Sequence, residues 1–361
     1  MDTPQKIRLL IFVPSLECGG TERYVSLLCN HIDINRFDVT LAVLNDAHPF
    51  YEIRHTIEVI DLKTKRVRNA LFRIKKLIKQ NKPDIIYSNA NHLNLLFALA
   101  RWMFPKNILI IARESSVVSI NSKRASYPKL YLSLIKKYYR RLDHIICQSA
   151  YMRQDLVSNF NVAPESITVI HNPVAEISGS TVNKNASIKK FITVARLSNE
   201  KGIDRLIRSV ALLDIPFEYY VVGEGNERTA LEKLINELQL QDKVFLTGEK
   251  IDPYQDMNDA DLMLCGSHYE GFPNALLEAG MLGIPVVAFN APGGIGEIIK
   301  DGENGLLVTS NAEKDLSNAI KRALDMNFDR QQIIDTTRQK YSPRIIVPKT
   351  MLIFENLLSE Q

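Results

Sequence analysis

The sequence has few cysteines, and their spacing fits neither a metal site nor a disulfide framework. Cys18, Cys29, Cys147 and Cys265 are far apart, with no Cys-x-x-Cys pair and no histidine cluster near them. This scatter argues against a zinc site and against a disulfide-stabilised secreted fold. It is typical of a protein from a reducing cytosol.

Long hydrophobic segments are also missing. The apolar run 7–13 leads into Pro14 and then Gly19-Gly20, which indicates a strand and a turn rather than a signal peptide. The longest apolar stretch, 93–104, is interrupted by Arg101 and is too short to cross a bilayer. We expect a buried helix there and no membrane-spanning segment.

The chain is long enough for two domains of ordinary size, with 361 residues, 45% of them hydrophobic and 24% charged. Its net charge of +4 is unevenly distributed. Residues 1–172 carry 25 Lys and Arg against 14 Asp and Glu, whereas the remainder carries 20 against 27. This asymmetry predicts two domains with different partners.

Alternating apolar runs and helical patterns predict two doubly wound α/β domains, each with a parallel sheet. The strands expected in the first half are 7–13, 39–44, 57–60, 84–88, 108–112 and 143–149, and the segment 167–174 closes this half. Those expected in the second half are 191–195, 219–222, 244–246, 262–265 and 286–289. A polar segment, 179–189, is expected to link the halves, and 346–358 to form a final amphipathic helix.

The segment 266–285, GSHYEGFPNALLEAGMLGIP, carries the most chemical information. Pro273 is predicted in the first turn of a helix, with Glu270 just outside its start and Glu278 about two turns inside. A helix start offers free N–H groups and a positive dipole end, which suit a phosphate. Two carboxylates beside such a seat suit a nucleotide sugar. The alternative is that Glu270 is a solvated loop residue and Glu278 an exposed helix residue.

This segment resembles the Glu-x7-Glu motif of glycosyltransferase family 4, retaining enzymes of the GT-B fold. The segments VARLSNEKG, GEGNER, GIPVVA, DGENGLL and GGTER resemble that family as well, so the resemblance covers nearly the whole chain. It implies two Rossmann-like domains that face each other across a cleft. The expected bounds are 1–171 for the acceptor-side domain and 172–342 for the nucleotide-sugar domain, with 343–361 a helix that packs back on the first.

Cleavage of a glycosyl–phosphate bond places charge on the leaving diphosphate, which fixed positive groups would stabilise. Arg196, at the end of a strand, and Lys201, just before a helix, are the candidates. The alternative is a surface arginine and lysine in a polar loop. We expect no metal and no other cofactor, because no Asp-x-Asp ligand pair stands where a metal-dependent transferase would hold one.

The resemblance also implies where the donor binds. Glu278 would accept hydrogen bonds from the ribose hydroxyls, and Glu270 would lie beside the donor sugar. The phosphate would meet the helix start around Gly271, Phe272, Asn274, Ala275 and Leu276 and, from the other domain, Gly19 and Gly20. The base would stack near Gly248 to Ile251, with UDP favoured by its frequency in the family. Gly293, Gly294 and Glu297 resemble a GGxxE segment that flanks the donor or caps a helix.

One position departs from the family. Many relatives carry a histidine near the donor sugar and the acceptor, at about the place where Ala112-Arg113-Glu114 stands here. A carboxylate at this place would serve as an acceptor-side base or bind a sugar hydroxyl, so Glu114 is a candidate catalytic residue. His92 and His171 are alternatives, although a lone histidine is more often structural.

Two basic stretches in the first half point to a further partner. Residues 63–82 contain nine basic residues and no acidic one, and 123–141 contain seven more among apolar residues at helical spacing. Such helices dock on anionic lipid, although two solvated helix faces would have the same pattern. Nucleic acid is a weaker third interpretation, because no recognised binding motif is present.

The resemblance therefore implies a retaining, metal-independent glycosyltransferase of cell-surface polysaccharide synthesis, and the basic first half suggests that it is peripheral at the cytoplasmic face of the cell membrane. It would move a hexose or N-acetylhexosamine from a UDP-sugar to a lipid-linked or growing saccharide. The alternatives are a catalytically silent GT-B subunit that binds sugar nucleotide or a partner transferase, a UDP-sugar epimerase or sugar phosphorylase of the same fold, and a peripheral binding protein without catalysis.

Overall fold

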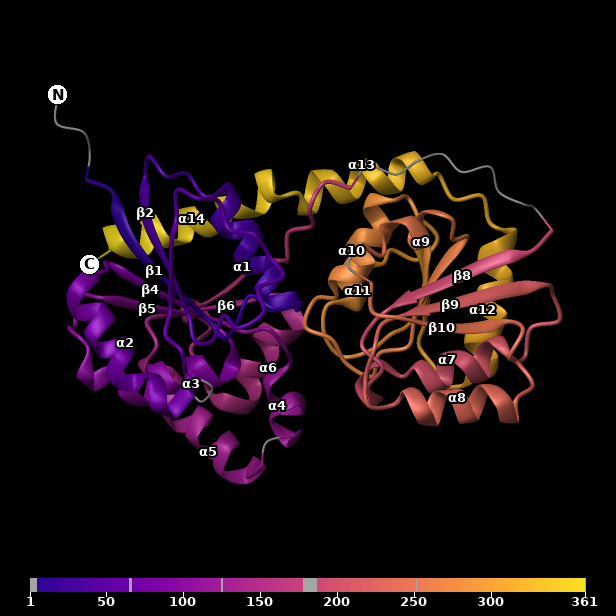
Figure 1. Ribbon diagram of the computed structural model, residues 1–361, viewed down its shortest axis with the longest axis horizontal. Coiled ribbons are helices and arrows are strands. Elements are labelled where there is room, and N and C mark those ends of the chain that lie inside the picture. The colour runs from indigo at the N-terminus through magenta and orange to yellow at the C-terminus, as the bar shows by residue number, and fades with distance from the viewer. Residues whose placement is uncertain (1–4, 65–66, 125, 178–186, 251, 361) are drawn as a thin grey trace. The chain divides into compact units, whose positions relative to one another are not determined.

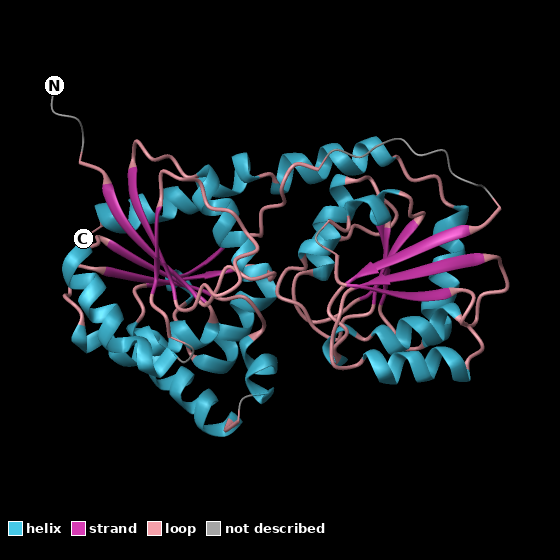
Figure 2. Ribbon diagram, viewed as in Figure 1, coloured by secondary structure: helices cyan, strands magenta, loops and turns pink. Residues whose placement is uncertain are grey.

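The computed structural model describes residues 5–64, 67–124, 126–177, 187–250 and 252–360. The chain forms two compact units (Figure 1). Unit 1 comprises Met1–Pro173 and Pro343–Gln361, and unit 2 comprises Val174–Ser342. In each unit, helices cover both faces of a parallel sheet (Figure 2), which is the layered arrangement that buried apolar strands require.

The sheet of unit 1 has seven strands in the order β3-β2-β1-β4-β5-β6-β7. Their bounds are β1 Ile7–Val13, β2 Phe37–Val43, β3 Glu58–Asp61, β4 Ile85–Asn89, β5 Leu109–Arg113, β6 His144–Cys147 and β7 Ile167–Val169. The helices are α1 Gly20–His31, α2 Val67–Asn81, α3 Asn91–Ala100, α4 Val118–Asn121, α5 Pro128–Tyr138, α6 Ala150–Phe160 and α14 Pro343–Ser359, with the short 3-10 helices η1 Arg101–Met103, η2 Ser122–Arg124, η3 Tyr139–Arg141 and η4 Pro164–Ser166.

Two apolar layers hold unit 1 together, one on each face of its sheet. On one face α1 and α14 pack on the strands, and the ring of Phe354 lies 5.0 Å from that of Tyr87. On the other face the buried residues come from α2, α3, α5 and α6. The last helix of the chain is therefore part of the core of unit 1. Burial of large aromatic rings such as that of Phe354 stabilises this packing.

The sheet of unit 2 has six strands in the order β10-β9-β8-β11-β12-β13. Their bounds are β8 Lys189–Val194, β9 Phe217–Val222, β10 Val244–Gly248, β11 Leu262–Cys265, β12 Val286–Phe289 and β13 Gly305–Val308. The helices are η5 Asn199–Lys201, α7 Ile203–Val210, α8 Arg228–Glu237, α9 Tyr254–Asn258, α10 Asn274–Met281, α11 Ile295–Ile298, α12 Glu313–Asp325 and α13 Arg330–Tyr341. One core lies under α7, α8 and α12, and the other under α10 and α11.

Strand order defines a switch point in each sheet. In unit 2, β8 and β11 are neighbours, and the chain continues from them to opposite edges of the sheet. In unit 1, the corresponding neighbours are β1 and β4. Loops that leave such a pair diverge, so ligands in open α/β sheets bind there.

The predicted two-domain α/β architecture is confirmed, but several details were wrong or missed. Strand β13 was not predicted, and neither were helices α8, α11, α12 and α13. Pro273 is the residue before α10 rather than part of its first turn. Of the expected linker 179–189, residues 179–186 lie outside the described residues. Among the described residues, no helix is long and apolar enough to cross a membrane.

Candidate functional site

The switch point of unit 2 brings together two predicted catalytic residues that lie far apart in the sequence. Lys201 follows β8 and Glu270 follows β11. Lys201 Nζ lies 2.7 Å from Glu270 Oε1, and the hydroxyl of Ser267 donates to the same oxygen at 2.6 Å. Their side chains are only 20% and 11% exposed. The pair is therefore a partly buried, charge-assisted contact, stronger than a neutral hydrogen bond.

Electrostatics keep Lys201 charged. Burial by itself lowers the pKa of this lysine, but the charge and hydrogen bond of Glu270 outweigh it, so the pKa lies above its ordinary value. The ammonium group is thus a permanent positive charge at neutral pH.

Two glycines allow the loops that carry this pair to meet. A Cβ on Gly202, where φ is +55°, would lie 2.1 Å from the carbonyl oxygen of Gly266, and a Cβ on Gly266 would lie 2.3 Å from that of Gly202. Backbones this close leave no room for any side chain. Arg205 of α7 fixes the loop after β11 at this point, because its guanidinium donates to the carbonyls of Gly266 and Ser267 at 2.6 Å each.

A third loop supports Glu270 from behind. Gly293 follows β12 with φ at +120°, and a Cβ there would lie 1.6 Å from the carbonyl oxygen of Glu270. The amide of Glu270 donates to the carbonyl of Pro292 at 2.9 Å. Gly294 lies against Gly271 and Phe272 in the same way. The two glycines of the GGxxE segment thus pack directly against the loop that carries Glu270.

Arg196 lies in the loop after β8, and its side chain is 78% exposed and lies 3.5 Å from Glu200. Its backbone is nevertheless fixed. A Cβ on Gly223 would lie 2.0 Å from the carbonyl oxygen of Ala195, and one on Gly225 2.1 Å from that of Leu197. The glycines of GEGNER therefore let the turn after β9 pack against the Arg196 loop.

Helix α10 carries Glu278 at its fifth position, a little over one turn from the start rather than two. Glu278 is buried, so the alternative of an exposed helix residue is wrong. The side chains of Phe272 and Leu276 are buried in the core of unit 2, and the Phe272 ring packs on that of Tyr341 at 5.6 Å. Only the backbone of these two residues could face a ligand, whereas Asn274 and Ala275 are half-buried.

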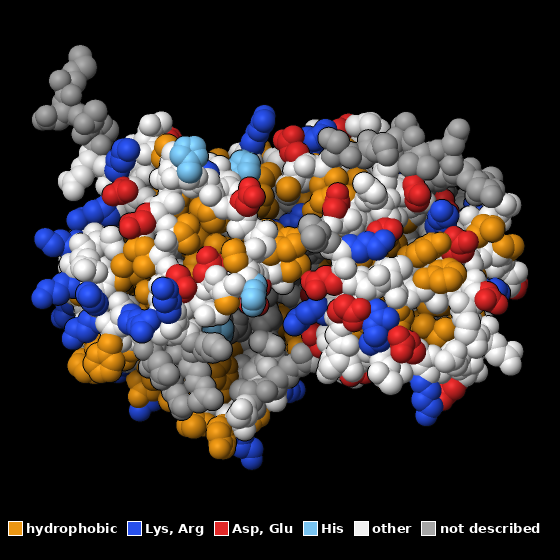
Figure 3. Space-filling view, in the orientation of Figure 1, with side chains coloured by type: hydrophobic (Ala, Val, Ile, Leu, Met, Phe, Trp, Pro, Cys, Tyr) orange, Lys and Arg blue, Asp and Glu red, His pale blue; other side chains and the backbone are white. Residues whose placement is uncertain are grey.

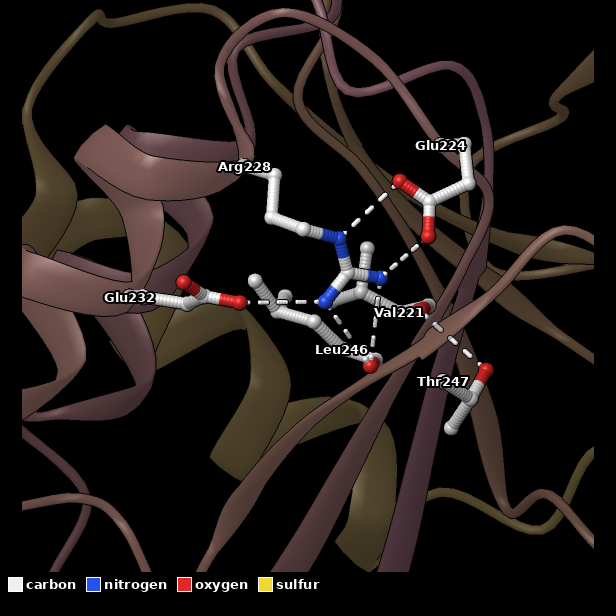
Figure 4. A network of polar contacts seen from close by, with 6 residues as sticks. All are labelled: Val221, Glu224, Arg228, Glu232, Leu246 and Thr247. Atoms are coloured by element: carbon white, nitrogen blue, oxygen red, sulfur yellow. Dashed lines mark hydrogen bonds and ion pairs between the residues drawn. The ribbon is translucent and has the colours of Figure 1, made fainter.

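Gly248 ends β10 with φ at +83° and accepts a hydrogen bond from the amide of Gly223. Beside it Arg228 of α8 donates to Glu224 at 2.6 and 2.9 Å, to Glu232 at 3.1 Å and to the carbonyl of Leu246 at 3.4 Å (Figure 4). This network fixes the edge where the base is expected. Ile251, the other residue predicted there, lies outside the described residues.

Gly19 and Gly20 stand at the switch point of unit 1, where Gly19 precedes α1 and Gly20 begins it. The carboxylate of Glu22, in the first turn, bends back over them: a Cβ on Gly19 would lie 2.2 Å from its Oε2. A negative group at a helix start is stabilised by the dipole and the free N–H groups. The Glu22 carboxylate therefore lies at the helix start where the diphosphate was predicted.

Glu114 is not where the sequence placed it. Its side chain is fully buried inside unit 1. Oε1 accepts hydrogen bonds of 2.8 Å from Asn94 Nδ2 and from the Tyr139 hydroxyl. Next to it, the buried guanidinium of Arg113 lies 3.5 Å over the Tyr24 ring. The expectation that Glu114 contacts the acceptor does not fit this geometry, because helices α3 and α5 with η3 cover the carboxyl group.

The buried carboxyl group predicts a pH dependence of stability. Burial raises the pKa of Glu114 to about 7, while the hydrogen bonds from Asn94 and Tyr139 oppose the rise. A raised carboxyl pKa means that the folded state retains a proton that the unfolded state loses, so stability falls as pH rises from about 4.5 to 7. Because glutamine cannot ionise, the Glu114→Gln variant should avoid up to about 3 kcal/mol of this loss in the free energy of unfolding.

Thermal unfolding from pH 4.5 to 8 measures this effect. The melting temperature of Glu114→Gln should rise relative to wild type as the pH increases, whereas the exposed Glu165→Gln should follow wild type throughout. Parallel curves for Glu114→Gln and wild type would contradict the shift.

The two histidine alternatives lie in unit 1. His92, at the start of α3, has an exposed side chain. Desolvation of its imidazole ring by the neighbouring protein lowers the pKa. His171 is half-buried after β7. Glu297 lies in α11, two residues after the helix begins.

Sequence reasoning missed Ser267, Arg205 and the Gly202–Gly266 contact. Ser267 could have been predicted from the sequence, because it lies three residues before Glu270 and just after a predicted strand. Arg205 could not, because only the fold shows that it points to the next loop. Within the described residues, no group of three or more histidine, cysteine or acidic side chains could hold a metal ion.

The two halves of the chain match two related families. Residues 18–176 match the family described as Glycosyltransferase Family 4, and residues 179–340 match Glycosyl transferases group 1. Among solved structures, Anabaena HepE in complex with UDP superposes with a TM-score of 0.78 at 19% identity, covering 98% of this chain and all of that one. Sucrose-phosphate synthase from Thermosynechococcus elongatus gives 0.82 at 18% identity, over 99% of this chain and all of that one.

Two curated relatives are similar over nearly their whole length. An N-acetylgalactosamine-N,N'-diacetylbacillosaminyl-diphospho-undecaprenol 4-alpha-N-acetylgalactosaminyltransferase from Campylobacter jejuni is 30% identical over 88% of this chain and 90% of its own. The amylovoran biosynthesis glycosyltransferase AmsD of Erwinia amylovora is 23% identical over 95% of this chain and 98% of its own. With the two family matches and the two parallel sheets, these similarities show that the chain belongs to the family 4 glycosyltransferases of the GT-B fold.

Proposed function

We propose that this glycosyltransferase moves a hexose or N-acetylhexosamine from a UDP-sugar to a lipid-linked or growing saccharide, with retention of configuration and without a metal ion. It would do so at the cytoplasmic face of the cell membrane, in the synthesis of a cell-surface polysaccharide. The observation that carries this proposal is the Lys201–Glu270 contact at the switch point of unit 2, with Arg196 exposed beside it.

The charges at this switch point suit a leaving diphosphate. When the bond between sugar and phosphate breaks, negative charge grows on the phosphate oxygens. Arg196 is free to turn toward them because its side chain is largely exposed, and Lys201 is held nearby by Glu270. Two positive groups can supply the stabilisation that a metal ion supplies elsewhere.

The buried carboxylate of Glu278 suits the ribose. A carboxylate accepts two hydrogen bonds at once and so can hold a pair of neighbouring hydroxyls. The Oε1 atom of Glu270 is shared by Lys201 and Ser267, so a sugar hydroxyl would bind at its second oxygen. The relatives support the acceptor class: the Campylobacter jejuni protein is named for transfer onto a diphospho-undecaprenol-linked sugar.

Thermal shift with UDP, GDP and ADP, in EDTA, tests the donor assignment. UDP at about 100 times its dissociation constant should stabilise the wild type by about 2.7 kcal/mol. Glu278→Gln should lose most of this shift, because one of the two acceptor oxygens becomes an NH₂ donor and the negative charge is lost. Glu237→Gln, an exposed glutamate of α8 in the same unit, is the matched control and should respond like wild type.

A second assay separates transfer from binding alone. Wild type supplied with UDP-sugars and a lipid-linked saccharide should form a longer saccharide whose new linkage has the configuration of the donor. No stabilisation by any nucleotide would overturn the donor site. Stabilisation by UDP without transfer to any lipid-linked saccharide would instead favour a silent subunit that binds sugar nucleotide.

A further inference from the structure

The outer surface of one helical layer of unit 1 exposes large apolar side chains. Phe72 on α2 is 81% exposed, Trp102 in η1 is 78% exposed and Leu130 on α5 is 59% exposed. Tyr127, just before α5, is also exposed. Apolar side chains this open are costly in water and mark interaction sites when they gather on one surface.

These residues belong to one layer. Helices α2, α3 and α5 pack side by side on the same face of the sheet, and η1 continues α3. On α2, Ala70, Ile74, Leu77 and Ile78 are buried against the strands, so Phe72 lies on the opposite side of the helix. On α5, Ile135 is buried while Leu130 faces outward. The exposed apolar groups therefore lie on the solvent side of that layer.

Positive charge surrounds these apolar groups. Lys76 and Lys79 share the outer stripe of α2 with Phe72, being four and seven positions beyond it, and Lys75 is exposed as well. On α5 and η3 the exposed basic residues are Lys129, Lys136, Lys137, Arg140 and Arg141. In the space-filling view, hydrophobic side chains lie next to blue ones over α2 and α5 (Figure 3).

Negative charge is nearly absent from this part of the chain. Between Lys63 and Leu142 the sequence has nineteen basic residues and only two acidic ones, Asp84 and Glu114. Asp84 is paired with Arg8 at 2.7 Å, and Glu114 is fully buried. The outer surface of this layer therefore combines a one-sign charge with exposed aromatic and aliphatic groups.

We propose that this surface, formed by α2, η1 and α5, docks on an anionic lipid bilayer, with Phe72, Trp102 and Leu130 entering the interface and the flanking lysines contacting lipid phosphates. Lysine can keep its charge at the headgroups while its stem covers apolar surface. Tryptophan and tyrosine prefer the membrane–water interface. A nucleic acid would use the charge but not the exposed aliphatic groups, and a second copy of this chain would place like charges opposite one another.

This inference adds the membrane partner to the proposed function, and its test uses no catalytic activity, so the two can fail separately. Trp102 is the only tryptophan in the chain, so intrinsic tryptophan emission reports on this surface alone. On vesicles of phosphatidylcholine with about 30% phosphatidylglycerol, the emission should shift to the blue, and lipids brominated in the upper acyl chain should quench it. Phosphatidylcholine alone should produce neither change.

Two variants divide the contributions to binding. Replacing Lys75, Lys76 and Lys79 together by glutamine should lower partitioning in vesicle sedimentation by about 100-fold. Phe72→Ser with Leu130→Ser should lower it by about tenfold or more. The matched control is Lys233→Gln with Leu212→Ser, a surface lysine and a surface leucine of unit 2, which should bind like wild type.

Several outcomes would overturn the proposal. Sedimentation with the vesicles without a blue shift would mean that Trp102 does not enter the interface. A blue shift that depends on protein concentration in the absence of lipid would identify a second copy as the occupant. Binding to duplex DNA as tight as binding to the anionic vesicles, and equally reduced by the lysine variant, would identify a non-specific polyanion surface.

Discussion

Lys201→Ala should lower kcat by about 10²–10³-fold, the usual effect of removing one preorganised group that stabilises charge in the transition state. The lysine is held 2.7 Å from Glu270 and remains charged, so no reorganisation is needed when the diphosphate leaves. The variant also leaves the largely buried carboxylate of Glu270 with Ser267 as its remaining side-chain partner. Steady-state kinetics with the sugar nucleotide as varied substrate measures the effect.

Two further variants test whether the loss of activity comes from the charge and position of Lys201. Lys233→Ala removes a surface lysine of α8 from an exposed ion pair and should leave kcat unchanged. Lys201→Arg keeps the charge but not its compact shape, and should recover part of the loss. A rise in KM with kcat intact would show that Lys201 binds the donor without stabilising the transition state.

Gly293→Ala should have the largest effect on the fold of the site. Its Cβ would fall 1.6 Å from the carbonyl oxygen of Glu270, and its φ of +120° is unfavourable for any L side chain. The loop must move, at a cost of more than about 3 kcal/mol, and Glu270 must move with it. We expect a melting temperature well below that of wild type and loss of transfer activity.

Gly302→Ala separates backbone strain from the clash. Gly302 also has a positive φ, +81°, but the nearest atom to its Cβ is Met326 Cε at 3.9 Å. This variant should cost only about 1–2 kcal/mol and retain activity. If the two variants are equally stable, or if Gly293→Ala is fully active, then the contact with Glu270 does not support the site.

Much of the site of unit 2 follows from one rule about parallel sheets. Lys201 and Glu270 each come soon after a predicted strand, and neighbouring parallel strands end at the same edge. The sequence could not show that β8 and β11 are those neighbours, because strand order depends on packing across the whole sheet. The resemblance to family 4 implied that both residues lie at the donor, but not that they contact each other.

Glu114 shows where such reasoning ends. Its position after β5 predicts a ligand-facing side chain, but its environment is set by Asn94 and Tyr139, from segments 20 and 25 residues away. Strand β13 was missed for a different reason. Its four residues, Gly305–Val308, are too few to show a period, and a glycine begins them. The fold class could thus be predicted, whereas the direction of individual side chains could not.

The contribution of α14 to unit 1 has a consequence for how the protein is made. Unit 2 is one continuous stretch of chain, whereas unit 1 needs residues from both sides of it. Synthesis proceeds at about 5–20 residues per second. Unit 2 can therefore fold before Phe354 has been synthesised, while the apolar surface around Tyr87 is still uncovered. A ribosome that stalls before residue 343 would release a chain in which unit 2 is folded and the core of unit 1 is open, and chaperones and proteases recognise such exposed cores. Completion of the polypeptide is thereby coupled to its survival in the cell.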